Sequence, residues 1–168
     1  DGLYVIDQHA AHERVLYERL LAARRRGGVM RQGLAVPLTV DLAPSHLATL
    51  SGHRAQLEQL GFDIEPFGPR TALLRAVPAP APADPDGLLH RALAALEGNG
   101  EGEDPLERAT IATACHTAIR AGDPMVSEAI AALVADLAAT EDPFTCFHGR
   151  PTIVVVPRDQ LERWFLRG

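Results

Sequence analysis

Glycine and proline residues divide this chain into short segments, and that division limits the folds that are open to it. Gly27-Gly28 and Gly61 each follow a stretch whose apolar residues have helical spacing, as expected at helix ends. Gly122-Asp123-Pro124 interrupts the pattern again, and the Pro- and Ala-rich stretch 78–86 is interpreted as a surface linker. Short helices that alternate with short β-branched strands predict an α/β (α+β) fold.

Cap and turn residues mark where the individual elements begin and end. Ser45 and Asp104 are placed to cap helices, and Glu107 is placed to complete a capping box with Asp104. Pro37 predicts an edge strand or a kink, because proline cannot donate to a strand ladder. The apolar run 152–156 predicts a buried strand. We expect helices at 9–26, 45–60, 88–96, 104–120, 127–138 and 159–167, and strands at 3–6, 34–42, 62–65, 72–77 and 152–156.

The length and composition indicate an ordinary globular protein. The chain has 168 residues, of which 46% are hydrophobic, enough for a core in one compact domain or two small subdomains. No apolar run is long enough to span a membrane and no signal-peptide pattern is present, so we expect a cytoplasmic protein. Two cysteines, Cys115 and Cys146, do not make a disulfide framework. They are compatible with a single disulfide, with two buried thiols or with two metal ligands.

The charge balance restricts how this chain can act on DNA. The formal net charge is −6, and all 16 residues counted as Lys or Arg are arginine. An acidic domain binds DNA poorly without sequence specificity, because the neutralisation of phosphates supplies most of that affinity. If the chain acts on DNA, something else must bring the DNA to it. Asp1-Gly2 is typical of a hairpin turn before a strand, and we expect the chain to be a fragment of a longer protein.

The segment from Asp7 to Glu13 lies where a strand is expected to pass into a helix. His9 and Glu13 are four residues apart and share one helix face, and Asp7 at the strand end can point into the same space. Two carboxylates and an imidazole in one pocket suit a divalent metal of borderline hardness. The alternative is that Asp7 caps the helix while His9 and Glu13 face solvent.

Two further segments carry possible metal ligands. Cys146 and His148 lie in a loop bounded by glycine and proline, where loop geometry allows both side chains to bind one metal ion. The alternative for this loop is a buried thiol beside a surface histidine. Cys115 lies on an expected helix, where core packing is the alternative to metal binding.

Taken together, these segments resemble the C-terminal domain of the MutL mismatch-repair proteins, in the branch that nicks DNA. The resemblance covers essentially the whole chain. Two positions depart from the motifs of that family, since His116 replaces a basic residue and Phe147 replaces a proline, but neither change removes a ligand. The matching motifs are Asp7-Gln8-His9-Ala10 with Glu13 and Glu18, Ala114-Cys115-His116, Cys146-Phe147-His148-Gly149-Arg150-Pro151, Phe165-Leu166-Arg167 and Gln32-Gly33-Leu34-Ala35-Val36-Pro37.

The resemblance implies a metal-dependent DNA endonuclease. It makes Asp7 and Glu13 catalytic, with Asp7 as the carboxylate needed for nicking. It implies bound Zn²⁺, and Mn²⁺ for nicking, because a metal polarises the phosphoryl oxygen and makes hydroxide at neutral pH. No ATP is expected in this part of the protein. The implied zinc ligands are His9, Glu13, Cys115, Cys146 and His148, and the residues implied to support them are Glu18, His116, Arg150 and Arg167.

The resemblance also implies a two-subdomain organisation. Residues 1–26 and 122–168 are expected to form a dimerisation subdomain, and residues 27–121 an inserted regulatory subdomain with flexible loops at 78–87 and 97–103. The resemblance also implies that the N-terminal ATPase domain of the family lies outside this chain. A homodimer is expected through the apolar segments 3–6, 130–137 and 152–156.

The implied partners would compensate for the weak DNA binding that is expected from the negative net charge. A sliding clamp, and a mismatch-recognition protein reached through the longer chain, would hold DNA near a domain that binds it weakly. The protein is then expected in the bacterial cytoplasm, near the nucleoid, without a membrane partner. The alternative is a non-catalytic dimerisation and scaffold module with a structural zinc site. The expected clamp-binding residues are Gln32, Leu34, Val36 and Pro37.

Overall fold

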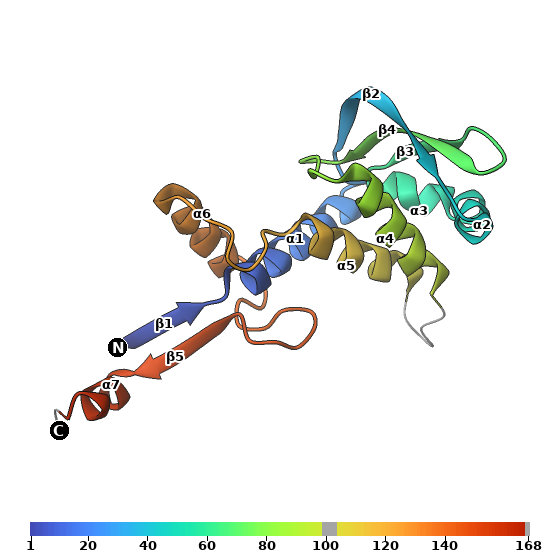
Figure 1. The fold of residues 1–168 in the computed structure, drawn as a ribbon. Coiled ribbons are helices and arrows are strands. Elements are labelled where there is room, and N and C mark those ends of the chain that lie inside the picture. Colours follow the sequence, from blue (N-terminus) through green and yellow to red (C-terminus); the bar gives the residue numbers. More distant parts are fainter. Residues whose placement is uncertain (99–103, 167–168) are drawn as a thin grey trace. The chain divides into compact units, whose positions relative to one another are not determined.

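The computed structural model describes residues 1–98 and 104–166 and has two compact units (Figure 1). One unit comprises Asp1–Leu16 and Ala118–Gly168, and the other comprises Tyr17–Thr117. The helix α1 (Gln8–Arg25) contributes its first residues to one unit and its last residues to the other. Helices and antiparallel sheets confirm the predicted α+β fold class. None of the described helices combines the length and the apolar character that a membrane span requires.

The unit of residues 17–117 is built on a three-stranded antiparallel sheet in the order β2-β4-β3 (Figure 1). The strands are β2 (Arg31–Asp41), β3 (Asp63–Pro66) and β4 (Thr71–Pro78). The helices that lie wholly within the described part of this unit are α2 (Pro44–Gly52), α3 (Arg54–Gln59), α4 (Pro85–Glu97) and α5 (Pro105–Thr117).

A continuous apolar core closes this unit. Phe62 and Leu74 are completely buried, and the helices add Leu57, Leu89 and Leu93 to the same cluster. Leu89 and Leu93 are one helical turn apart, so both lie on the buried face of α4. Burial of each such side chain contributes about 1.5–3 kcal/mol, and residues of this unit alone form the cluster.

The strand β2 is an edge strand, as Pro37 predicts. Its pairing with β4 shifts between Gly33 and Leu38, so the residues around Pro37 leave the regular ladder. A proline has no N–H to donate, which explains why the irregularity falls here. Val36, in this irregular stretch, is 77% exposed.

The single helix expected over 45–60 is wrong. The structure has two helices there, α2 and α3, with His53 in a non-helical conformation between them. Ser45 does not cap α2, because the N-cap is Ala43 and Pro44 takes the first helical position. Within the expected linker 78–86, α4 already begins at Pro85, where the Asp84 side chain accepts a hydrogen bond from the Gly87 N–H.

The start of α5 follows half of the expected capping box. Asp104 Oδ1 accepts the Leu106 N–H at 3.0 Å. Glu107 was expected to reach back to the backbone, but its Oε1 accepts the Tyr17 hydroxyl at 2.6 Å instead. The Glu107 side chain therefore bonds to Tyr17 on α1 and not to the backbone at the start of α5. Of the loop expected at 97–103, residues 99–103 lie outside the described residues.

The other unit pairs the two ends of the chain. β1 (Gly2–Ile6) lies antiparallel to β5 (Ile153–Pro157), followed by α7 (Arg158–Trp164). A small core joins the first part of α1 to α6 (Ser127–Ala138) through Ala11, Val15, Leu133 and Leu137. The helix expected over 159–167 ends at Trp164, and Arg167 lies outside the described residues.

The expectation that strand 152–156 is buried is wrong for this chain by itself. Thr152 is buried, but Val154 is 51% exposed and its partner on β1, Val5, is also 51% exposed. A sheet of two strands needs further elements to cover its apolar faces. The apolar run was correctly read as a strand, but its cover is not supplied by the described residues.

Candidate metal centre

Asp7 caps the helix that carries the candidate ligands. Its Oδ1 accepts the backbone N–H groups of His9 at 2.9 Å and Ala10 at 3.1 Å. Its own N–H donates to the Thr152 carbonyl at 3.0 Å, which ties the start of α1 to the segment before β5. The capping alternative for Asp7 is therefore present in the structure. A carboxylate that caps a helix is also fixed in orientation.

His9 is oriented by a backbone carbonyl. Its Nδ1 lies 2.8 Å from the Ile119 oxygen, and because a carbonyl only accepts, Nδ1 carries the proton. The other ring nitrogen, Nε2, lies 3.3 Å from Glu13 Oε1. A metal-binding histidine commonly has its second nitrogen held in this way.

His12 and Gln8 hold the same stretch of chain, and sequence reasoning missed both. The Ile119 N–H donates to His12 Nδ1 at 2.9 Å, so two imidazoles hold the two sides of one residue's backbone. Gln8 Nε2 donates to the carbonyls of Arg120 and Asp123, each at 2.9 Å. α5 was expected to continue to 120 but ends at Thr117. The backbone groups that follow are bonded by these side chains and not by helix hydrogen bonds. The spacing of His9 and His12 by three residues was the available clue.

Glu13 is the buried acid of the site. Its side chain is only 2% exposed, and its oxygens face His9, His148 and Arg150. The alternative in which Glu13 faces solvent is therefore wrong. A carboxylate is buried at high cost unless a cation or hydrogen-bond donors compensate it, which makes this position a natural cation site.

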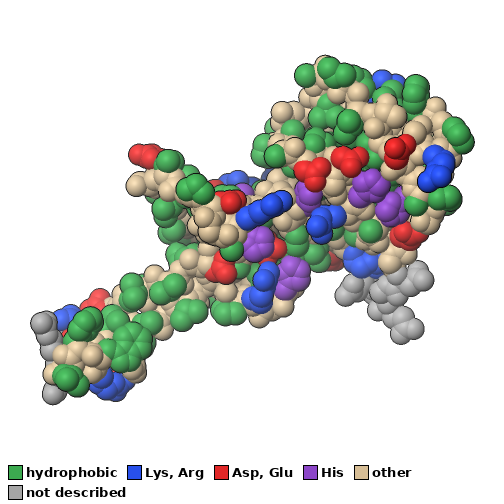
Figure 2. All heavy atoms as spheres, in the orientation of Figure 1, with side chains coloured by type: hydrophobic (Ala, Val, Ile, Leu, Met, Phe, Trp, Pro, Cys, Tyr) green, Lys and Arg blue, Asp and Glu red, His purple; other side chains and the backbone are tan. Residues whose placement is uncertain are grey.

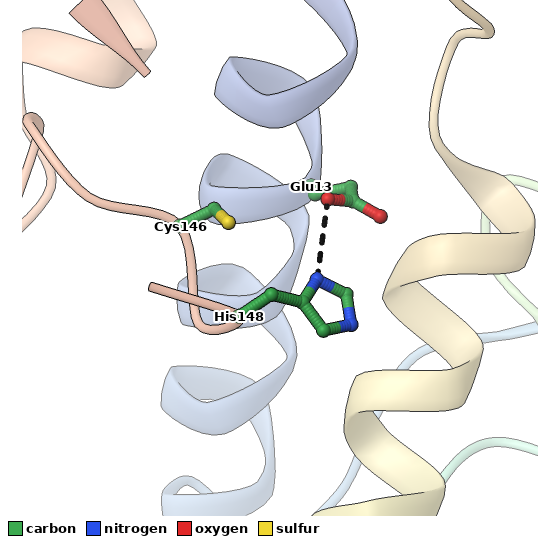
Figure 3. A group of neighbouring side chains, drawn as sticks. All are labelled: Glu13, Cys146 and His148. Atoms are coloured by element: carbon green, nitrogen blue, oxygen red, sulfur yellow. Dashed lines mark ion pairs between the residues drawn. The ribbon is translucent and has the colours of Figure 1, made fainter. Parts of the chain in front are cut away.

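A tight turn brings Cys146 and His148 to Glu13 (Figure 3). The Cys146 N–H donates to the Arg150 carbonyl at 2.8 Å, and the Gly149 N–H donates to the Cys146 carbonyl at 2.9 Å. Gly149 has φ +76°, a conformation that glycine adopts without strain. Outside the turn, Arg14 Nε donates to the Thr145 carbonyl at 2.7 Å and so fastens the loop to α1, a role that sequence reasoning did not identify.

The three side chains form one donor group. A carboxylate oxygen of Glu13, the sulfur of Cys146 and a ring nitrogen of His148 all lie within 4.8 Å of one another. In Figure 3 they point toward a common space from α1 and the loop, and the dashed line joins Glu13 to His148. Cys146 is buried while His148 is exposed, so one side of the group opens to solvent. Oxygen, sulfur and nitrogen donors together fit a borderline divalent ion such as zinc.

Arg150 is the charge partner of this group. Its guanidinium NH2 lies 3.0 Å from Glu13 Oε2 and 3.4 Å from His148 Nδ1. A hydrogen bond with Cys146 and the negative charge of Glu13 raise the pKa of Arg150 above its already high ordinary value. Phe147, where the family motif has a proline, packs beside His148 with ring centroids 4.3 Å apart.

The remaining expected site residues lie elsewhere in the chain. Cys115 on α5 and Glu18 on α1 belong to the unit of residues 17–117, and their part in a metal site stays a prediction. His116 Nε2 lies 3.0 Å from the Asp84 carbonyl in that unit. In the expected clamp segment, Gln32 Oε1 accepts the Ala81 N–H at 2.8 Å, so this side chain is engaged by its own chain.

The strand pair and α6 expose many apolar side chains. Figure 2 shows hydrophobic side chains gathered over the end of the molecule that carries β1, β5 and α7. Clusters of exposed apolar side chains are typical of interaction sites. The exposed apolar residues of these elements are Leu3, Tyr4, Val5, Ile130, Val134, Val154, Val155 and Trp164.

Comparison with known proteins identifies the family. A family model described as the MutL C terminal dimerisation domain matches residues 1–125. The DNA mismatch repair protein MutL of Symbiobacterium thermophilum is 42% identical over 174 residues, covering 99% of this chain and 27% of that relative. The protein of the same name from Gemmatimonas aurantiaca is 42% identical over 170 residues, covering 99% of this chain and 28% of the relative. The chain thus spans little more than a quarter of these curated relatives. It belongs to the family of MutL C-terminal dimerisation domains.

Proposed function

We propose that this chain is the dimerisation and nicking domain of a mismatch-repair protein, and that a divalent metal ion at Glu13, Cys146 and His148 serves strand cleavage. The observation that carries the proposal is the buried Glu13 carboxylate, which lies with the Cys146 sulfur and a His148 nitrogen inside 4.8 Å. Inert core packing does not require a buried acid beside a thiol and an imidazole. Cys115 stays a proposed fourth protein ligand on the strength of its motif alone.

The residues of the site have separable tasks in this proposal. Glu13, Cys146 and His148 hold the ion, and His9 turns Nε2 toward Glu13 because its Nδ1–H is held by a carbonyl. A bound divalent ion polarises a phosphoryl oxygen and lowers the pKa of bound water. Zinc suits the thiolate-containing set, and manganese is the proposed ion for nicking.

Asp7 is the proposed catalytic carboxylate. Its Oδ1 is used by two backbone N–H groups, which fixes the plane of the carboxylate. Oδ2 is then the atom that accepts a hydrogen bond from the attacking water. This is general-base positioning by an exposed acid at a helix start.

Homodimerisation is proposed through β1, β5 and α6. Leu3 and Tyr4 on β1 and Val155 on β5 are about half exposed in the single chain. A two-stranded sheet is marginally stable by itself, so a second copy that covers these side chains supplies the missing cover.

Clamp binding is proposed at the irregular part of β2. Val36 is exposed on an edge strand, and the residues between Gly33 and Leu38 are out of the ladder register. An extended apolar segment stiffened by Pro37 is suited to docking in an apolar pocket. A clamp would also compensate for the net charge of −6, which disfavours direct DNA binding.

The second candidate is a non-catalytic dimerisation module with a structural zinc site. Two contacts favour it. Asp7 has a structural role as a helix cap, and Arg150 already compensates the charge of Glu13. A structural metal centre would require no catalytic role for Asp7 beyond this helix cap.

A nicking assay separates the two candidates. Asp7→Asn keeps the cap, because asparagine caps helices as well as aspartate does, but it removes the acid. We expect nicking of supercoiled plasmid with Mn²⁺ to fall by about 100-fold or more, the size of a general-base contribution, while zinc content stays unchanged. The matched control is Asp159→Asn, an exposed acid in the first turn of α7, which should nick normally. Unchanged nicking by Asp7→Asn at intact zinc content would favour the structural candidate.

A further inference from the structure

Two histidines in the unit of residues 17–117 face each other through the same ring nitrogen. His46 on α2 and His90 on α4 have their Nδ1 atoms 3.4 Å apart, with ring centroids at 5.5 Å and a tilt of 48°. Figure 2 shows histidine side chains grouped with acidic ones on the face that carries α4. The two residues are 44 positions apart, so only the fold brings them together.

Each imidazole has a carboxylate behind it. His46 Nε2 lies 3.5 Å from Glu97 Oε2, and His90 Nε2 lies 4.0 Å from Asp86 Oδ2. A carboxylate accepts hydrogen bonds and does not donate them, so each pairing favours the proton on Nε2. With both protons on Nε2, the lone pairs of the two rings sit on Nδ1, and the 3.4 Å between these atoms then holds either a shared proton or a cation. Two facing lone pairs repel, and the arrangement is relieved by a cation between them.

The separation of the two nitrogens matches a metal ion. Zinc–nitrogen bonds are about 2.0–2.1 Å long, so two nitrogens bound to one tetrahedral zinc lie about 3.4 Å apart. Metal-binding histidines also commonly have a carboxylate at their second nitrogen, and Glu97 lies 3.5 Å from His46 Nε2, whereas Asp86 at 4.0 Å from His90 Nε2 is beyond hydrogen-bond distance. The geometry points to a second site, for a borderline divalent ion such as zinc, bound by Nδ1 of His46 and of His90.

The helices α2 and α4 hold the two histidines in place, and the site is open to solvent. Leu50 on α2 and Leu89 and Leu93 on α4 are buried in one core, which fixes the two helices that present the rings. The His90 side chain is 36% exposed, so an ion can enter from water, and water molecules complete its coordination. Two imidazoles without a thiolate bind zinc more weakly than a set that includes cysteine. The site is therefore one that exchanges its ion with the surroundings.

The test counts zinc ions in the purified protein. Equilibrium dialysis against zinc, read by elemental analysis, should give one ion fewer per chain for His46→Asn and for His90→Asn than for the unchanged protein. Glu97→Gln should retain the site with about tenfold weaker zinc affinity, the usual cost of losing a supporting carboxylate. Glu58→Gln is the matched control, an exposed acid of the same unit paired with Arg54, and should leave zinc binding unchanged.

A second measurement needs no variant. In ¹⁵N spectra of the histidine rings, added zinc should shift the Nδ1 resonances of His46 and His90 together. Equal zinc stoichiometry in the unchanged protein and in both histidine variants would overturn the inference. So would ring resonances that respond to pH but not to zinc, because a shared proton would then occupy the position between the rings.

Discussion

In the unit of residues 17–117, the sheet and helices cover one another, and Phe62, Leu57 and Leu74 are completely buried. In the unit that joins the chain ends, four small or medium side chains form the core, while Val5 and Val154 stay half exposed. The first unit has an extensive apolar core formed by its own residues. The second leaves apolar strand residues uncovered, as expected of an obligate subunit interface, which resembles a domain core cut in half.

The largest expected effect tests the self-contained unit. Phe62→Ala should lower the free energy of unfolding by about 3–5 kcal/mol, because it removes a large buried ring and leaves a cavity. Chemical denaturation followed by circular dichroism measures this loss, which should not depend on protein concentration. The control is Phe67→Ala, in the same unit but 64% exposed, which should change stability little. Equal effects of the two variants would contradict the assigned core.

The next effect tests the uncovered surface. Val5→Asp places a charge on β1 opposite Val154, where the proposed dimer would bury it, and should weaken association by about 3 kcal/mol, roughly 100-fold. Sedimentation velocity over a dilution series measures the change. The control is Val36→Asp, the same change at a valine of β2 that is 77% exposed, which should leave the dimer intact. A dimer that survives Val5→Asp would place the interface elsewhere.

The smallest effect concerns the polar interior of the second unit. Arg150→Ala removes the cation nearest Glu13 and should cost about 1–3 kcal/mol of unfolding free energy in a metal-free buffer. Because a divalent ion would replace the lost charge, added zinc should restore most of this stability. Thermal unfolding with and without zinc measures both values. Arg158→Ala, which removes only an exposed pair with Glu162, should cost less than about 0.5 kcal/mol. A loss that zinc does not reduce would argue against metal at Glu13.

Most helices and strands could be predicted because nearby cap and turn residues mark where they begin and end. α6 was expected at 127–138 and is found there, and the strand at 3–6 differs by one residue. The break at His53 was missed although Gly52 precedes it, because a single glycine inside a helical pattern does not by itself end a helix. The exposure of Val154 was missed because an apolar run does not say whether its cover comes from the same chain or from a second one.

The site was predictable in composition but not in its contacts. Motifs and spacing brought Glu13, Cys146 and His148 to attention, and these three are the group that the fold assembles. Spacing could not decide whether Asp7 caps the helix or faces the ligands, since an aspartate at that position can serve both roles. Nothing in the sequence pairs His46 with His90, because the two residues meet only after the core has formed.

If the proposed metal ion binds at Glu13, the contact of Arg150 with Glu13 makes its uptake an exchange. The guanidinium lies on the oxygen that faces His148, so an arriving ion must displace a bound cation before it can use that oxygen. The measured affinity would then be the difference between two binding energies, and uptake would be limited by the departure of the arginine side chain. A centre of this kind discriminates against weakly binding ions such as magnesium, because only ions that also gain the sulfur and nitrogen donors recover the contact that they replace.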